Sequence, residues 1–288
     1  MDLAAILAIE FLYFIASLAL ISAGLAIIFG MMRVINFAHG EFLMLGAFAV
    51  LTATDLGINL WVAILIVAPA FVGLVGIVIE RLLVRRLYGR IIVSLLATWG
   101  LSFFLIGLAT AVFGNVSRGV TAPIGAITIG QYKTGGYTLF VIAVAVVVLV
   151  SAYVFLRFTR AGLIARGAMQ NPTMAAALGI DTTRVYAITF GVGAALSGLA
   201  GAVLAPFAGV IPTMGLAYVA KAFITVISGG VAVLAGTAAA ATLYGTVNQA
   251  VTFLTGPVIG EAALLGTALV LLRVMPQGIT SRLFRRAM

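Results

Sequence analysis

Long, nearly uncharged apolar runs dominate this sequence from end to end. They cover about residues 8–30, 41–55, 60–79, 91–113, 137–156, 185–205, 216–232, 236–254 and 258–275. A helix that crosses a bilayer needs about 20 mostly apolar residues. The runs are continuous, which excludes a β-barrel, whose strands alternate over about ten residues. The pattern predicts an all-α, polytopic membrane helical bundle of about eight transmembrane helices, give or take one. The second and seventh runs are short or polar enough to be broken or re-entrant.

The composition excludes the other common classes of protein. The chain is 64% hydrophobic and 8% charged, whereas a soluble domain has about 45–50% apolar and about 25% charged residues. This leaves too little polar surface for a soluble enzyme, a disordered chain or a secreted disulfide scaffold. Cysteine is absent and there is one histidine, so neither a disulfide framework nor a metal site is expected.

The arginines predict the orientation in the membrane. The net charge is +9, and cytoplasmic loops carry the excess of basic residues in membrane proteins. Eleven arginines lie in three short segments: Arg81, Arg85, Arg86 and Arg90; Arg157, Arg160, Arg166 and Arg184; and Arg282, Arg285 and Arg286. These segments are predicted to be cytoplasmic, and the loop near 114–136 external. No basic segment precedes the first run, so no cleaved signal peptide is expected. No connection is long enough for a soluble domain, so residues 1–288 are predicted to form a single transmembrane domain.

Small residues recur every fourth position in the sixth run. One row holds Gly193, Ser197 and Gly201, and the neighbouring row holds Gly198 between two alanines. Such rows let helix backbones approach closely in lipid. We expect Gly193, Ser197, Gly198 and Gly201 to pack inside the bundle or against another subunit, rather than to contact substrate.

A polar cluster interrupts the apolar pattern between the first two runs. The segment GMMRVINFAHGE, Gly30–Glu41, contains Arg33, Asn36, His39 and Glu41 and has glycines near both ends. Its spacing fits two interpretations equally. One is an ordinary cytoplasmic turn anchored by Arg33; the other is part of a translocation path, because ionisable residues inside a membrane commonly mark such paths.

Lys221 is a second charged residue within an apolar stretch. Its long side chain either snorkels to the outer surface or lines a cavity. Glu261 and Arg273 are expected near the two ends of the last span.

The connection at 159–190 carries the signals of a short capped helix. Asn171 precedes a proline and so marks a helix start, and Gly179 marks the stop. A solvated connector needs no capped helix, whereas a docking surface for a cytoplasmic partner does. We assign to this surface the segment at about 159–184, with these residues: Gly162, Arg166, Asn171, Ala175, Ala176, Leu178 and Gly179.

No motif in the chain indicates catalysis. The only lysines, Lys133 and Lys221, do not follow a glycine-rich phosphate loop. No Ser/His/Asp set or paired carboxylates stand out. The chain is therefore not expected to be an enzyme or to bind nucleotide.

Several of these segments together resemble a known family. The stretch Gly24–Phe48, which contains NFAHGE, resembles the first signature of the permease subunits of branched-chain amino acid ABC importers. The connection at 159–190 resembles their ATPase-coupling loop, and Lys221–Gly230 and Arg273–Ile279 also fit. The likeness covers nearly the whole chain in order. It departs after Gly230, where the family usually continues with Gly-Ser and then Pro-Gly, and this chain has VAVLAGT.

The resemblance implies a set of partners and a location. The partners would be a second homologous permease subunit, expected as a heterodimer, two cytoplasmic ATPase subunits that bind ATP, and an extracytoplasmic substrate-binding protein. The chain itself would hold no cofactor, contact membrane lipid but no nucleic acid, and lie in the bacterial inner membrane. Its substrate would be a branched-chain or other small amino acid. The alternatives are the same type of importer for urea, short amides or small carboxylates, and an ion-coupled secondary transporter.

Overall fold

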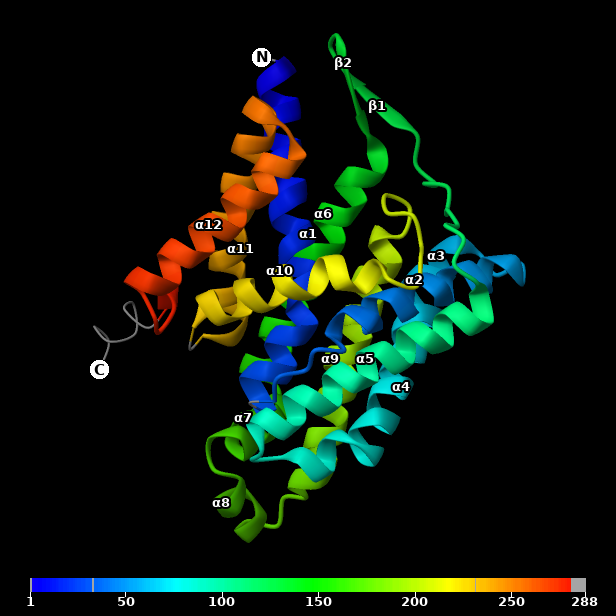
Figure 1. The fold of residues 1–288 in the computed structure, drawn as a ribbon. Coiled ribbons are helices and arrows are strands. Elements are labelled where there is room, and N and C mark those ends of the chain that lie inside the picture. The colour runs from blue at the N-terminus through cyan, green and yellow to red at the C-terminus, as the bar shows by residue number, and fades with distance from the viewer. Residues whose placement is uncertain (1, 33, 231, 281–288) are drawn as a thin grey trace. The chain divides into compact units, whose positions relative to one another are not determined.

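The computed structural model describes residues 2–32, 34–230 and 232–280, and most of them are helical (Figure 1). The helices are α1 (Asp2–Met32), α2 (His39–Asp55), α3 (Leu60–Val62), α4 (Ala68–Leu82), α5 (Ile91–Phe113), α6 (Gly136–Phe158), α7 (Arg160–Gln170), α8 (Pro172–Ala177), α9 (Thr182–Leu204), α10 (Met214–Gly229), α11 (Val233–Thr255) and α12 (Pro257–Val274). A π-helical turn, η1 (Ala63–Val67), joins α3 to α4, and a 3₁₀ turn, η2 (Val84–Leu87), follows α4. The prediction of an all-α, polytopic bundle is confirmed.

The helices that can cross a membrane follow the predicted apolar runs. Within the described residues, six are long and apolar enough: α1, the continuous Leu60–Leu82 segment, α5, α6, α9 and α12. The bent pair α10 and α11 would add a seventh if it counts as one span. The second and seventh runs, predicted to be short or broken, are α2, with 17 residues, and α10, with 16 residues.

The loop at 114–136 contains a β-hairpin that the sequence interpretation missed. Strands β1 (Ala126–Ile129) and β2 (Tyr132–Gly135) pair antiparallel, with Ile129 opposite Tyr132. The turn between them uses Gly130 at φ 60°, a left-handed conformation that glycine adopts at no steric cost. The signal was present, because AITIGQYKTG alternates around a glycine, as a hairpin does.

Contacts divide the chain into two compact units. Unit 1 comprises residues 1–22, 121–149 and 221–288, and unit 2 comprises residues 23–120 and 150–220. Of the described residues, unit 1 buries one core cluster: Leu18, Ala19, Ala240, Ala241, Tyr244, Leu264 and Ala268. Unit 2 holds the α1–α2 break, the connection at 159–184 and the small-residue rows of α9. The single transmembrane domain predicted for residues 1–288 stays a prediction.

Unit 2 is assembled around α9, whose small residues leave no room for side chains. A Cβ atom on Gly193 would meet Ile28 of α1, and one on Gly201 would meet the backbone of Leu43 in α2. Gly198 lies against Val72 of α4. Close approach of this kind replaces the hydrophobic driving force that helices lack in lipid. The small rows therefore lie in the seams that α9 forms with α1, α2 and α4.

The two ends of unit 2 differ in charge. At one end, Arg81 in the last turn of α4 and Arg85 after it line a cleft with Asp181 and Arg184 at the start of α9. At the other end, Asp55 after α2 forms an ion pair of 2.7 Å with Arg118, whose backbone also pairs with Val210 after α9. The arginine-rich segments at 81–90 and 160–184 therefore share one end, as expected if both are cytoplasmic. The third segment, the arginine tail, lies outside the described residues.

Candidate functional site

The chain between α1 and α2 breaks out of helical conformation at residues 34–38. A threonine of α5 holds the break in place. The Thr98 hydroxyl accepts a hydrogen bond from the backbone N–H of Phe37 at 3.1 Å. Its single proton is within reach of two carbonyls at 3.2 Å, that of Ile35 in the break and that of Leu95 within α5. Thr98 is fully buried. One side chain therefore contacts two backbone groups of the break, at Ile35 and Phe37.

The break packs against parts of α5 and α9 that lie well inside the ends of these helices. Thr98 follows the start of α5 by seven residues, about 10 Å along a helix at 1.5 Å per residue. His39, which ends the break, contacts Ser197, about 10 Å from the far end of α9. Non-helical backbone at such depth is tolerated only where protein buries it or where it lines a polar cavity. Of the two interpretations left open by the spacing, the ordinary surface turn is the one that this depth disfavours.

The polar residues of the break are buried, and several of their atoms have no partner. Asn36 is fully buried; its Oδ1 accepts from the N–H of Ala38 at 3.1 Å. Its Nδ2 has no hydrogen-bond partner in the described part of the chain. A buried donor left without a partner costs about 1–3 kcal/mol. The amide group of Asn36 therefore keeps its donor available for a bound molecule.

Glu41 is a second buried polar residue whose side-chain atoms lack partners among the described residues. It is 1% exposed, and neither of its carboxylate oxygens has a hydrogen bond to a described residue. The hydroxyl of Ser102 on α5 faces it without reaching hydrogen-bond geometry. An unpaired buried carboxylate is far more costly than an unpaired amide. The Glu41 carboxyl group is therefore able to accept a hydrogen bond from a cationic or hydrogen-bond-donating ligand.

His39 is attached to α9 through a small residue of its packing rows. Its Nδ1 lies 3.2 Å from the Ser197 hydroxyl, and both residues are fully buried. The Ser197 hydroxyl also donates to the carbonyl of Gly193 at 2.9 Å. Because a hydroxyl has one proton, His39 Nδ1 must then be the donor to Ser197. Ser197, predicted only as a packing residue, therefore also orients the imidazole.

Three hydroxyl residues of α5 escaped the sequence interpretation. Ser94, Thr98 and Ser102 recur every fourth residue, and each is at most 2% exposed. Thr98 contacts the break at Phe37, and Ser102 lies near Glu41 in the first turn of α2. The signal was available, because hydroxyls at helical spacing within an apolar run mark one polar stripe on a helix.

Of the other two residues assigned to the path, one lies outside the described part of the chain and one belongs to the other unit. Arg33 lies outside the described residues. Lys221 belongs to unit 1, where its ammonium group pairs with the carboxylate of Glu261. The Lys221 side chain is 26% exposed, so it is neither freely solvated nor sealed in a core.

The connection at 159–184 folds into two helices where the sequence predicted one. The unpredicted helix is α7, which starts with Thr159 accepting a bond from the N–H of Gly162 at 3.0 Å. The predicted short helix is α8. Asn171 caps it by accepting from the N–H of Met174 at 2.9 Å, and Gly179 follows it at φ 82°. The start and stop signals were thus read correctly, and the helical period of 160–170 was overlooked.

Exposure differs sharply among the residues assigned to this segment. Gly162 and Ala175 are buried, whereas Ala176 and Leu178 are exposed, Leu178 at 75%. The Nε atom of Arg166 is buried without a hydrogen-bond partner in the described residues. One side of α8 therefore packs on the protein, and the other presents an alanine and a leucine to its surroundings.

The turn after α10 is held by the closing segment of unit 1. Thr280 accepts from the N–H of Ala232 at 3.2 Å and donates to the carbonyl of Gly229 at 2.5 Å. Gly230 and Gly278, both at positive φ, approach each other backbone to backbone. The chain thus closes the turn where it departs from the family pattern, although Val231 itself lies outside the described residues.

Comparisons with known proteins agree over most of the chain. A family model described as the permease component of branched-chain amino acid transport systems matches residues 7–274. The high-affinity branched-chain amino acid transport system permease protein LivH is 28% identical in Salmonella typhimurium and 29% in Escherichia coli K12. In both cases the match covers 95% of this chain and 97% of the relative. The corresponding protein BraD of Pseudomonas aeruginosa is 27% identical over 92% of this chain and 91% of its own length. No solved structure gives a significant match.

Proposed function

The chain belongs to the family of permease components of branched-chain amino acid transport systems, and from this we propose that it is the permease subunit of an ATP-driven importer for branched-chain or other small amino acids. It is a multi-pass inner-membrane protein of a transporter family, not a member of a known enzyme family. The relatives found are named for branched-chain amino acids, which favours this substrate class over urea, short amides or small carboxylates.

We propose that the α1–α2 break lines the translocation path, with Asn36, His39 and Glu41 facing the substrate. The observation that carries this proposal is that both oxygens of the buried Glu41 carboxyl group and the Nδ2 donor of buried Asn36 have no hydrogen-bond partner among the described residues. An acceptor and a donor at one broken helix complement the ammonium and carboxylate groups of an amino acid. A substrate that satisfies both atoms would offset the cost of leaving them unpaired.

The test is uptake after a minimal change at Glu41. Glu41→Gln keeps the shape and removes the charge, so we expect ATP-dependent uptake of leucine into proteoliposomes to fall by roughly tenfold or more, given the cost of losing a charged hydrogen bond. Glu10→Gln, a half-buried carboxylate of α1 in the other unit, is the matched control. Equal uptake by both variants at equal reconstitution would return the break to a structural role. Urea uptake at the rate of leucine would overturn the substrate class.

The partners of the family supply the energy in this proposal. A chain without its own nucleotide site needs ATPase subunits, which we expect as a pair, with a second permease subunit as a heterodimeric partner and a binding protein outside. ATP is then bound only by the partners. Lys221 remains in the proposal as a path residue that Glu261 neutralises between substrates.

The α7–α8 segment is the proposed contact with the ATPases. Its capped, partly buried helix α8 can transmit a displacement that a flexible connector would absorb. Ala176→Trp should release the ATPases or uncouple hydrolysis from uptake, because the exposed Ala176 would no longer fit a cleft. Ala122→Trp, an exposed position in the loop at 114–136, is the control. Co-purification and leucine-dependent ATPase activity check this; an Ala176→Trp variant that binds and couples normally would contradict it.

A further inference from the structure

The seam between α4 and α9 opens into a polar cleft at its arginine-rich end. Along the seam, Gly73 and Ile77 of α4 lie against Ala195 and Gly191 of α9. The same row of α4, continued by one and two turns, reaches Arg81 and then Arg85 in η2. A cleft of about 390 Å³ begins there, lined by Arg81, Arg85, Asp181, Thr183, Arg184 and Ala187.

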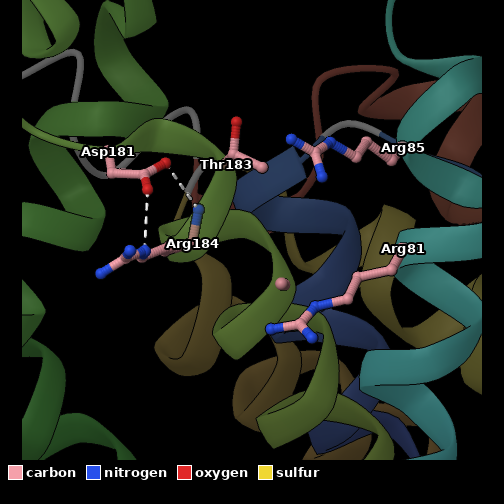
Figure 2. Close-up of a pocket in the computed structure, with 6 residues that line it drawn as sticks. Arg81, Arg85, Asp181, Thr183 and Arg184 are labelled. Atoms are coloured by element: carbon pink, nitrogen blue, oxygen red, sulfur yellow. Dashed lines mark hydrogen bonds and ion pairs between the residues drawn. The ribbon is translucent and has the colours of Figure 1, made fainter.

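The cleft carries an excess of positive charge. Figure 2 shows Arg81 and Arg85 reaching from the α4 side toward the start of α9, while Arg184 turns to Asp181. The Asp181 carboxylate is already occupied, since it pairs with Arg184 at 2.9 Å and caps α9 by accepting from its N–H. Arg81 and Arg85 form no ion pair within the described residues. Two guanidinium groups therefore face the cleft without an anion.

A nearby carboxylate does not neutralise them. Glu80 is fully buried and accepts a hydrogen bond from the Tyr88 hydroxyl at 2.5 Å. Burial, and then the bond to Glu80, raise the pKa of Tyr88 above its usual range, so the hydroxyl stays protonated and keeps donating. Glu80 is thus held beneath the surface by Tyr88, away from the open side of the cleft.

The surroundings of the cleft mark the level of lipid headgroups. Large apolar side chains of α4 stay exposed up to the arginines, Val78 at 53% and Leu82 at 63%. On α9, Ile188 is 60% exposed just beyond the cleft. Exposed apolar surface that gives way to arginines within one turn is where a membrane-spanning helix leaves the hydrocarbon core.

We propose that this cleft binds the phosphodiester of an anionic phospholipid. Arg81 and Arg85 would hold the phosphate oxygens, because guanidinium groups match phosphate geometry. The Thr183 hydroxyl, which lines the same cleft, would add a further donor. The exposed apolar side chains of α4 and α9 would contact the acyl chains. A bound lipid would join α4 to α9 at the end where their own packing stops.

The test measures lipid retention by the purified full chain. Native mass spectrometry of the protein in mixed phosphatidylglycerol and phosphatidylcholine should show retained phosphatidylglycerol. Arg81→Gln with Arg85→Gln should lower that retention by roughly tenfold. The matched control is Arg86→Gln with Arg90→Gln, two exposed arginines of the same segment outside the cleft. Arg81→Lys with Arg85→Lys keeps the charge and should restore part of the binding, which separates lost binding from misfolding.

Each other result has a defined meaning. An equal loss of phosphatidylglycerol retention in both double-glutamine variants would show that the lipid responds to the overall surface charge and not to the cleft. That result would overturn the proposal. Complete displacement of the lipid by millimolar inorganic phosphate would assign the cleft to a soluble phosphate instead. Unchanged lipid retention with lost ATPase binding would assign the arginines to acidic side chains of that partner. Because none of these readouts measures substrate uptake, their failure would leave the proposed transport function untouched.

Discussion

Two regions of unit 2 solve the problem of packing in a membrane in opposite ways. In the seams around α9 the helix backbones approach closely, because glycines such as Gly193 and Gly201 lie against the backbone or side chains of neighbouring helices. The α1–α2 break is followed by His39, which contacts the same helix through Ser197. The break region buries polar groups and leaves some of their atoms unpaired among the described residues. The first arrangement favours stability at the cost of adaptability. The second leaves buried polar atoms unpaired, which costs stability.

The comparison predicts which residues control folding and which control transport. A residue in a seam should affect folding far more than transport when it changes, and a residue of the break should affect transport far more than folding. Ser197 belongs to both regions, since it lies in a small-residue row and also bonds His39. The variants below are arranged to separate the two effects.

The largest effect on folding is expected from Gly201→Leu. A side chain there would collide with the backbone of Leu43, which cannot move aside without displacing α2. Overpacking typically costs about 1–3 kcal/mol and more when backbone must shift. The yield of monodisperse protein and its thermal unfolding midpoint should both drop. Gly100→Leu, on α5 with open space around it, should leave both near the parent values; equal losses in the two variants would show that the seam is not special.

An effect of opposite sign is expected from Glu41→Met. An apolar side chain of similar length removes a buried, unpartnered carboxylate, so the free energy of unfolding should rise by about 1–3 kcal/mol. Leucine uptake should be lost at the same time. Denaturant or thermal unfolding and an uptake assay on the same preparation measure the two quantities. A variant that is less stable than the parent would mean that Glu41 has a partner in the folded state and contributes to stability.

A smaller, mixed effect is expected from Thr98→Val. The change keeps the shape but removes the hydroxyl that contacts the backbone of Phe37 and Ile35, at a cost of about 1–2 kcal/mol. Uptake should fall severalfold because the break is less firmly positioned. Thr110→Val, whose hydroxyl bonds only within α5, is the control. If both variants transport alike, Thr98 does not position the break.

Local signals in the sequence predicted most of the helices. The apolar runs at 91–113 and 258–275 correspond closely to α5 and α12, because a membrane span is specified by length and hydropathy alone. The cap of α8 was also predicted, since Asn171, its proline and Gly179 act within one turn of the chain. The hairpin in the loop at 114–136 and the helix α7 were missed, although their patterns of alternation and helical period are local as well.

The candidate site was only partly predictable. The polar residues Asn36, His39 and Glu41 were visible as an interruption of the apolar pattern. The sequence could not separate the two interpretations of this segment, a surface turn or part of a translocation path, because the depth of the segment in the membrane depends on which helices it packs against. Thr98 and Ser102 lie some 60 residues away in sequence, and nothing local connects them to the break.

The sequence by itself determined that this chain is a helical membrane protein, and where its helices and its family signatures lie. Those properties follow from hydropathy, capping and glycine placement, each of which acts over a few neighbouring residues. Only the tertiary structure decided that the NFAHGE segment contains a break in contact with Thr98 of α5, that Ser197 contacts His39, and that Arg81 and Arg85 lie at a cleft by the start of α9. These arrangements depend on contacts between segments far apart in the chain, which are set by how side chains fill the space between helices.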